Sequence, residues 1–149
     1  MVQRIQSLYL LLSGVCMALV LKFPFANFAK IGSFDAWGHH LSEGVTADSL
    51  LPFPAYYLVL GLILLTLIAI FMFKNRKIQI LLGRLNYLLI LGLIVVLYLN
   101  IDKLNESLNS TIEYGVGLYL PVAALAFNFL ANRAIKKDQD LIKSLDRLR

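Results

Sequence analysis

Long apolar runs separated by polar segments dominate the sequence. Four of them are long enough to be helical membrane spans, at residues 5–21, 53–73, 78–99 and 114–130. A run of about 20 residues at 1.5 Å per residue crosses a hydrocarbon core of about 30 Å. Since only residues 74–77 separate the second run from the third, these two helices have to be antiparallel. The pattern predicts an all-α membrane protein, a four-transmembrane-helix antiparallel bundle that forms one membrane domain over residues 1–149.

The link at residues 74–77, KNRK, predicts how the bundle is oriented. Lys and Arg near the ends of spans resist translocation, so a link this basic marks the cytoplasmic side. With both termini on the same side as the link, eleven of the fourteen basic residues are cytoplasmic. The three others are Lys22, Lys30 and Lys103. We therefore expect an N-in/C-in topology.

Three polar segments complete this topology. An outer loop of about 30 residues, 23–52, contains several Phe residues and Trp37. Aromatic side chains favour the membrane interface, so we expect this loop to lie on the membrane surface or to pack over the bundle end as a short hairpin or helix. Residues 100–113 form a second, shorter outer loop. In the tail, residues 131–149, apolar positions at helical spacing predict a cytoplasmic amphipathic C-terminal helix that continues from the fourth span.

A signal peptide is the competing interpretation of the first apolar run, because a short apolar run after a basic residue resembles one. Arg4 is the only charge before the run, and no clear A-x-A cleavage site follows it. We expect a retained span. Cys16 lies within this run and is the only cysteine, so it forms no internal disulfide. We interpret it as a small apolar side chain.

The composition supports lipid exposure rather than a soluble fold. Hydrophobic residues make up 59% of the chain and charged residues 15%, whereas a soluble domain is closer to 45–50% apolar. A net charge of +5 would suggest a nucleic-acid partner in a soluble protein. Here the placement of positive charge on one side of the membrane accounts for it, and we expect no nucleic-acid partner.

Four polar residues near the cytoplasmic ends of the third and fourth spans form a candidate site. They are Arg84, Asn86, Asn128 and Asn132. A charge inside a span indicates function by default, but Arg84 is shallow enough to extend its side chain to the inner headgroups. The alternative is therefore structural: Arg84 reinforces orientation, and the amides form interhelical hydrogen bonds worth about 0.6–2 kcal/mol each.

Two further groups of residues suggest binding. The basic tail could contact anionic lipid or a protein partner through Arg133, Lys136, Lys137, Lys143 and Arg147. In the first outer loop, His39 and His40 lie close to Asp35 and Glu43, which are residue types that bind divalent metals. Their spacing matches no specific zinc pattern, so a metal site is the weaker hypothesis there, and we expect no cofactor.

Three stretches are similar to a known family when they are taken together. They are QRIQ followed by LYLLL at residues 3–12, KNRKIQILLGRLN at 74–86 and RAIKKDQDLIKSLDRLR at 133–149. In combination they resemble a bacterial family of small four-span inner-membrane proteins catalogued as a domain of unknown function. The resemblance covers nearly the whole chain and is weakest in the first outer loop. It implies a Gram-negative inner-membrane location but no activity, cofactor or catalytic residue.

These patterns favour a non-enzymatic accessory or scaffold subunit. Such a subunit would sit in the lipid bilayer and contact a protein partner, or a second copy of itself, through the basic tail and the aromatic outer loop. The alternative is a small transporter or channel with its polar site in the inner leaflet, although transport usually requires ionisable groups at mid-depth. A membrane enzyme ranks third, because the spans contain no His and no acid for general acid–base chemistry.

Overall fold

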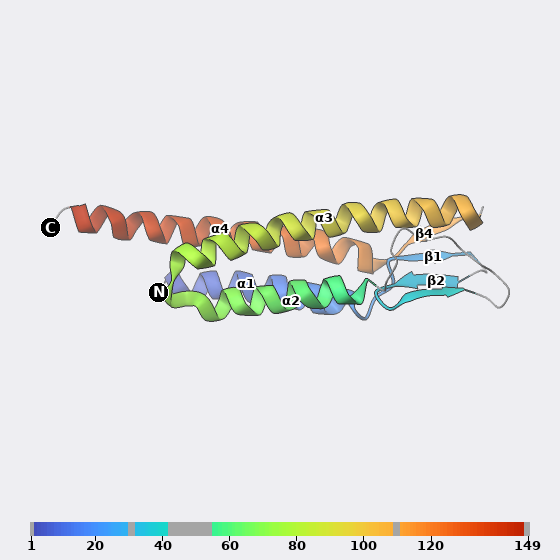
Figure 1. Ribbon diagram of the computed structural model, residues 1–149, viewed down its shortest axis with the longest axis horizontal. Coiled ribbons are helices and arrows are strands. Elements are labelled where there is room, and N and C mark those ends of the chain that lie inside the picture. Colours follow the sequence, from blue (N-terminus) through green and yellow to red (C-terminus); the bar gives the residue numbers. More distant parts are fainter. Residues whose placement is uncertain (1, 30–31, 42–54, 109–110, 148–149) are drawn as a thin grey trace.

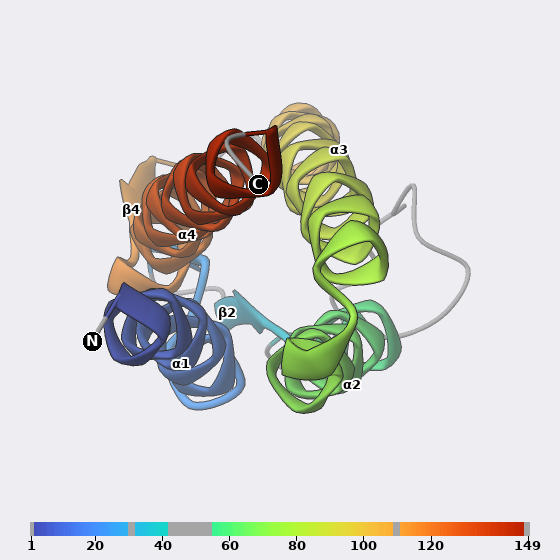
Figure 2. The ribbon, with the colours of Figure 1, turned by 90° about the vertical axis from the view of Figure 1, so that its left-hand side faces the viewer.

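The computed structural model describes residues 2–29, 32–41, 55–108 and 111–147. Helices account for most of this chain, as predicted, and they lie side by side with a small sheet at one end (Figure 1). The helices are α1 (Val2–Val20), α2 (Tyr56–Phe71), α3 (Arg76–Leu108) and α4 (Val116–Arg147). Viewed from the end opposite the sheet, they form a ring in which α1 and α3 each lie between α2 and α4 (Figure 2).

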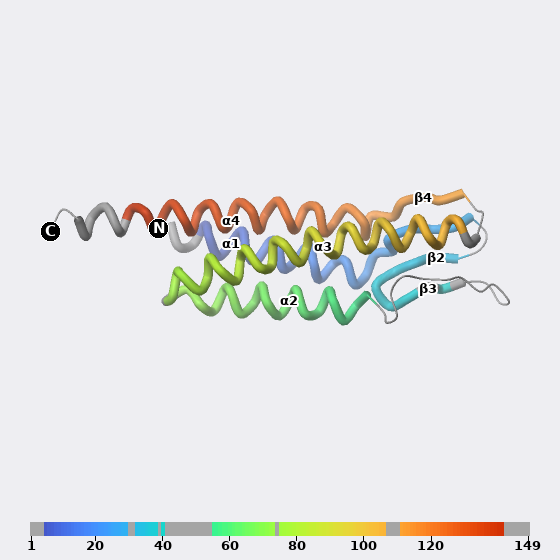
Figure 3. Tube along the Cα trace, turned by 45° about the horizontal axis from the view of Figure 1, so that its top comes forward, coloured from blue at the N-terminus to red at the C-terminus, as the bar shows by residue number. Residues whose placement is uncertain are grey.

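The helices differ in length, and this difference shapes the molecule. The 16 residues of α2 span about 24 Å, and the 3₁₀ helix η1 (Met72–Lys74) that follows adds about 6 Å. The 33 residues of α3 span about 50 Å. At one end α3 continues alongside the sheet, and at the other end α4 projects beyond the remaining helices (Figure 3). Both termini lie at the end opposite the sheet (Figure 1).

The predicted boundaries of two segments next to α3, the link at 74–77 and the loop at 100–113, were wrong. Within residues 74–77, Lys74 belongs to η1 and Arg76 begins α3, so Asn75 alone separates the two helices. The predicted outer loop at 100–113 is helical through Leu108. Its charges suggested a solvated loop, but Ile101 and Leu104 repeat at helical spacing and are buried beside the sheet. Because burial of these side chains stabilises the helical conformation, α3 continues well past residue 99.

The sheet corrects the all-α prediction. It is antiparallel, in the order β3-β2-β1-β4, with strands β1 (Ala26–Phe28), β2 (Gly32–Asp35), β3 (Gly38–Leu41) and β4 (Ile112–Tyr114). The first three strands come from the predicted loop at 23–52, which confirms the hairpin alternative, and β4 comes from the segment between α3 and α4. The remainder of that loop, with Glu43, and the predicted start of the second span at residue 53 lie outside the described residues.

Aromatic residues of the sheet segment form the core at this end of the bundle. Phe25, Phe28 and Phe34 are buried and belong to the same apolar cluster as Leu97 and Leu104 of α3. The rings of Phe25 and Phe34 lie 5.3 Å apart. Periodicity alone did not predict these strands, because they are only three or four residues long and are ordered by contacts with distant helices.

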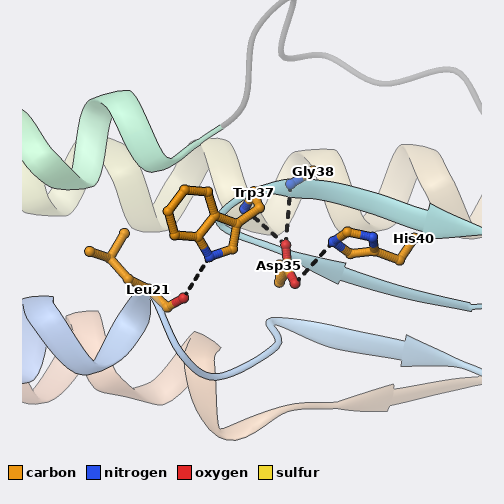
Figure 4. Close-up of polar contacts among 5 residues, drawn as sticks. All are labelled: Leu21, Asp35, Trp37, Gly38 and His40. Carbon is orange, nitrogen blue, oxygen red and sulfur yellow. Dashed lines mark hydrogen bonds and ion pairs between the residues drawn. The ribbon is translucent and has the colours of Figure 1, made fainter.

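The turn between β2 and β3 is attached to the ends of two helices. Asp35 Oδ1 accepts hydrogen bonds from the backbone N–H groups of Trp37 (2.8 Å) and Gly38 (3.2 Å), and Gly38 has a φ of 140° that favours glycine (Figure 4). Trp37 Nε1 donates to the carbonyl oxygen of Leu21 at 2.9 Å, and the Trp37 ring stacks on Tyr56 with centroids 4.9 Å apart. The hairpin therefore connects the C-terminal end of α1 to the start of α2.

Large apolar side chains cover the outside of all four helices, as exemplified by Leu8, Phe71, Leu88 and Tyr119, each more than 50% exposed. Polar side chains instead occur in the interior, namely Gln6, Ser13, Thr66, Gln79, Asn86, Asn100 and Asn128. By length and composition, α3 and α4 can cross a membrane, in the ranges Arg76–Glu106 and Val116–Leu141. The apolar parts of the other two helices, Ile5–Val20 and Tyr56–Phe71, are shorter.

Candidate functional site

The interior polar side chains connect helices mainly through backbone carbonyl groups. Gln6 Nε2 of α1 donates to the Ala134 oxygen of α4 at 3.3 Å, and Ser13 Oγ donates to the Ala124 oxygen of α4 at 2.9 Å. Gln79 Nε2 of α3 donates to the Ala69 oxygen of α2 at 3.1 Å. Sequence reasoning missed these contacts. The available signal was that Gln6 and Ser13 lie two helical turns apart on one face of a mostly apolar helix.

The four residues predicted to form one polar layer do not all meet. Asn86 is buried and its Nδ2 donates to Thr66 Oγ1 of α2 at 2.8 Å, while the Thr66 hydroxyl donates to the Leu62 carbonyl at 2.8 Å. On α4, Asn132 Nδ2 donates to Asn128 Oδ1 at 3.1 Å. The amides therefore form two separate hydrogen-bonded pairs.

Gly83 determines how closely Asn132 approaches α3. A Cβ atom at residue 83 would collide with the carboxamide of Asn132, so only glycine leaves room for this side chain against the α3 backbone. The contact places Asn132 at the junction of α3 and α4. It also explains a glycine in the middle of a helix, where it costs about 1 kcal/mol relative to alanine.

Arg84 is exposed and lines an open groove between α3 and α4. The groove has a volume of about 520 Å³, and its lining consists of Ile80, Arg84, Tyr87, Leu88, Phe129, Asn132, Arg133 and Lys136. Tyr87 and Phe129 face each other across it with ring centroids 6.4 Å apart. The structure thus brings Arg84 together with Asn132 and with two of the cations predicted from the tail.

The other tail residues lie farther along α4. Lys137 borders a second surface groove together with Asp140 and Leu141. Lys143 and Arg147 belong to α4 by their backbone, and their side chains lie outside the described residues. Between these positions, Asp138 Oδ2 pairs with Arg76 Nη1 at 3.0 Å and ties the C-terminal part of α4 to the start of α3. Sequence reasoning missed this ion pair, because no spacing rule relates residues on different helices.

The two candidate metal-binding histidines, His39 and His40, lie on the strand β3 rather than on a helix. His40 Nε2 lies 3.3 Å from Asp35 Oδ2 and joins the turn described above (Figure 4). The side chains of His39 and Glu43 lie outside the described residues. Within the described part of the chain, no three His, Cys, Asp or Glu side chains cluster as a metal site would require.

The α3–α4 groove is the arrangement best suited to bind a ligand. It combines three cationic side chains with an apolar aromatic wall, which suits an anionic amphiphile. Comparison with known proteins gives no ligand, since no curated protein and no solved structure matches the chain. A family model described as a domain of unknown function (DUF4293) matches residues 2–148. The resemblance to a family of unknown function is therefore confirmed, and the chain belongs to this family.

Proposed function

We propose that the protein is an integral protein of a bacterial inner membrane that crosses the bilayer four times. The pairing of β1 with β4 carries this proposal. The strand β1 lies between α1 and α2, the strand β4 lies between α3 and α4, and Asn27 is opposite Glu113 in their register. Because paired strands lie on one side of a bilayer, and α1 and α2 pack along α4 and α3, we expect the α1–α2 hairpin to cross where the α3–α4 hairpin crosses.

The short helices are long enough for this role. The 19 residues of α1 span about 28 Å, and α2 with η1 spans about 30 Å, close to the hydrocarbon thickness of about 30 Å. The distribution of side chains also supports the proposal. Polar groups that face one another inside, with large apolar groups outside, suit a lipid solvent and would expose an unusually large apolar surface in water.

The charge distribution supports an N-in/C-in orientation. The start of α3 and the C-terminal part of α4 lie at the end opposite the sheet, where both termini are found (Figure 1). Arg76 begins α3, and Arg133 and Lys137 belong to the C-terminal half of α4. Exposed aromatic residues gather toward the sheet end and suit the outer interface, namely Trp37, Tyr57, Tyr98, Tyr114 and Tyr119.

Within this topology the protein acts as a non-enzymatic accessory or scaffold subunit. The C-terminal part of α4 supports this assignment, because α4 projects beyond the other helices (Figure 3). Lys137, Asp140 and Leu141 in this part of the helix are exposed. A mixed basic and apolar helix face of this kind suits a protein partner on the cytoplasmic side. The sheet would present the exposed Trp37 face to a partner on the outer side.

The accessory role predicts a specific contact at the projecting end of α4. A photo-crosslinking amino acid at Lys137 or Leu141 should give one discrete protein adduct in cells, because these exposed side chains would touch the partner. The matched control is Leu81, which is 66% exposed on the apolar outside of α3 and should give no protein adduct. If membrane-localised protein gives no adduct from either α4 position, the accessory role through this helix is wrong.

A small transporter or channel is the second candidate. Among the described residues, Asn86 Oδ1, Asn128 Nδ2 and Asn132 Oδ1 are buried without a hydrogen-bond partner. Unmet polar groups in the interior could bind water or a permeating solute. Ion flux into proteoliposomes distinguishes the two roles, because a scaffold with a closed interior conducts no ions.

A further inference from the structure

The groove between α3 and α4 changes in polarity along its length, and the same change occurs on both walls. On α3, Arg84 precedes Tyr87 and Leu88 by about one turn. On α4, which runs the opposite way, Phe129 precedes Arg133 by about one turn. The cations of both helices therefore lie nearer the link between η1 and α3, next to Ile80, and the aromatic side chains and Leu88 lie toward the middle of the bundle.

Distances along the helices place these cations at one level. The rise along the axis of α3 between Tyr98 and Arg84 is about 21 Å, and the rise along α4 between Tyr119 and Arg133 is also about 21 Å. If the two tyrosines lie at the outer interface, extended arginine side chains at this depth reach the inner headgroup region. The apolar part of the groove then lies at the depth of the acyl chains.

In the part of the chain that the structure describes, acidic side chains lie near the groove but do not line it, since Asp140 borders the second surface groove together with Arg133 and Lys136. Within the described residues, neither Arg84, Arg133 nor Lys136 takes part in an ion pair, and no acidic side chain lines the groove. The nearby carboxylate of Asp138 is already paired with Arg76. Three cations that line one groove and form no ion pair with the described residues suit a phosphate group, to which arginine can donate two hydrogen bonds at once.

We propose that this groove binds one anionic phospholipid of the cytoplasmic leaflet. The phosphate lies against Arg84, Arg133 and Lys136, and an acyl chain lies along Leu88 and Phe129. The graded polarity of the groove favours a lipid over a free phosphate, since a free ion would leave the apolar half uncovered. The proposal rests on the membrane orientation proposed above and adds a defined ligand to it.

Native mass spectrometry of the purified full-length protein in mild detergent tests the lipid site. Phosphatidylglycerol and phosphatidylcholine with identical acyl chains are added in turn. We expect one phosphatidylglycerol molecule per chain to be retained, with phosphatidylcholine bound at least about tenfold more weakly, because it has no net charge to offset the cations. Equal retention of the two lipids would overturn the proposal.

Charge-matched variants separate the groove from basic character in general. Arg84→Gln combined with Arg133→Gln should lower phosphatidylglycerol retention about tenfold or more. Lys77→Gln combined with Lys137→Gln removes the same charge outside the groove and should change retention less than about twofold. Equal losses in the two double variants would show nonspecific attraction and contradict the proposal. Thermal unfolding of lipid-free protein verifies that each variant is folded.

Two further measurements identify the ligand source and separate this proposal from the proposed topology. Inorganic phosphate at a concentration equal to that of the lipid should not displace phosphatidylglycerol, and Phe129→Ala should weaken lipid binding. Displacement by phosphate alone would mean that the groove recognises a free anion. Lipid selectivity in detergent does not depend on orientation. If the protein shows no lipid selectivity but has the expected orientation in cells, only the lipid site is refuted. If its orientation in the membrane is the reverse of the expected one, the topology is refuted.

Discussion

Gly117→Ala should strongly destabilise the protein. Gly117 lies at the start of α4, and its N–H donates to the Pro24 carbonyl at 3.0 Å. A Cβ atom there would collide with the backbone carbonyl oxygens of Phe23 and Pro24. Backbone atoms cannot rotate away as side chains can, so we expect a loss of about 3 kcal/mol or more. Thermal unfolding in detergent, followed by size exclusion of the remaining folded fraction, measures this loss.

Gly92→Ala is the matched control for that variant. Gly92 lies in the middle of α3, and an added Cβ atom would meet no described atom within 4 Å. Alanine has the higher helix propensity, so the variant should be unchanged or more stable by about 1 kcal/mol at most. If the Gly92 and Gly117 variants melt alike, the close approach of the start of α4 to residues 23–25 is incorrect.

The second large loss of stability is expected from substitutions at Ser13. The volume of the side chain there should affect stability more than its hydrogen bond does. Ser13 is fully buried where α1 meets α4, and its hydroxyl donates to the Ala124 carbonyl. Ser13→Ala keeps the small volume and should cost less than about 1 kcal/mol. Ser13→Leu would force the two helices apart and should cost about 2–3 kcal/mol.

Unfolding of both Ser13 variants in the same detergent measures this difference. Leu11→Ala, on the exposed side of α1, controls for a simple change in the hydrophobicity of the helix. It should have little effect, because the side chain it shortens is about half exposed on the outside of α1. A Ser13→Leu protein as stable as the wild type would show that α1 and α4 are not closely packed at this position.

The four helices could be predicted from the sequence because each has a long apolar run. The ends of the helices were harder to predict. Residues 100–108 contain several charges, and only burial of Ile101 and Leu104 against the sheet reveals why α3 continues. The sheet was missed for a similar reason. Its short strands are stabilised by pairing between segments far apart in sequence, such as Ala26 with Tyr114, and local patterns do not encode such pairing.

The candidate site was predictable in part. Asn128 and Asn132 are four residues apart on one helix, and their mutual hydrogen bond follows from that spacing. The partner of Asn86, in contrast, is Thr66 on another helix. The sequence also did not show that Arg84 would share a groove with Arg133 and Lys136, since this depends on the relative rotation of α3 and α4. Contacts within a helix were therefore accessible, and contacts between helices were not.

The central claim is that four helices cross the membrane with the sheet outside, and cysteine accessibility tests it most directly. In a Cys16→Ala background, single cysteines replace Asn27 in β1, Glu113 in β4, Asn75 before α3 and Lys137 in α4. An impermeant maleimide is applied to intact spheroplasts and then to lysed ones. Asn27→Cys and Glu113→Cys should react in intact spheroplasts, and Asn75→Cys and Lys137→Cys only after lysis. Labelling of the two strand positions on different sides, or of Asn75→Cys from outside, would contradict the proposed topology.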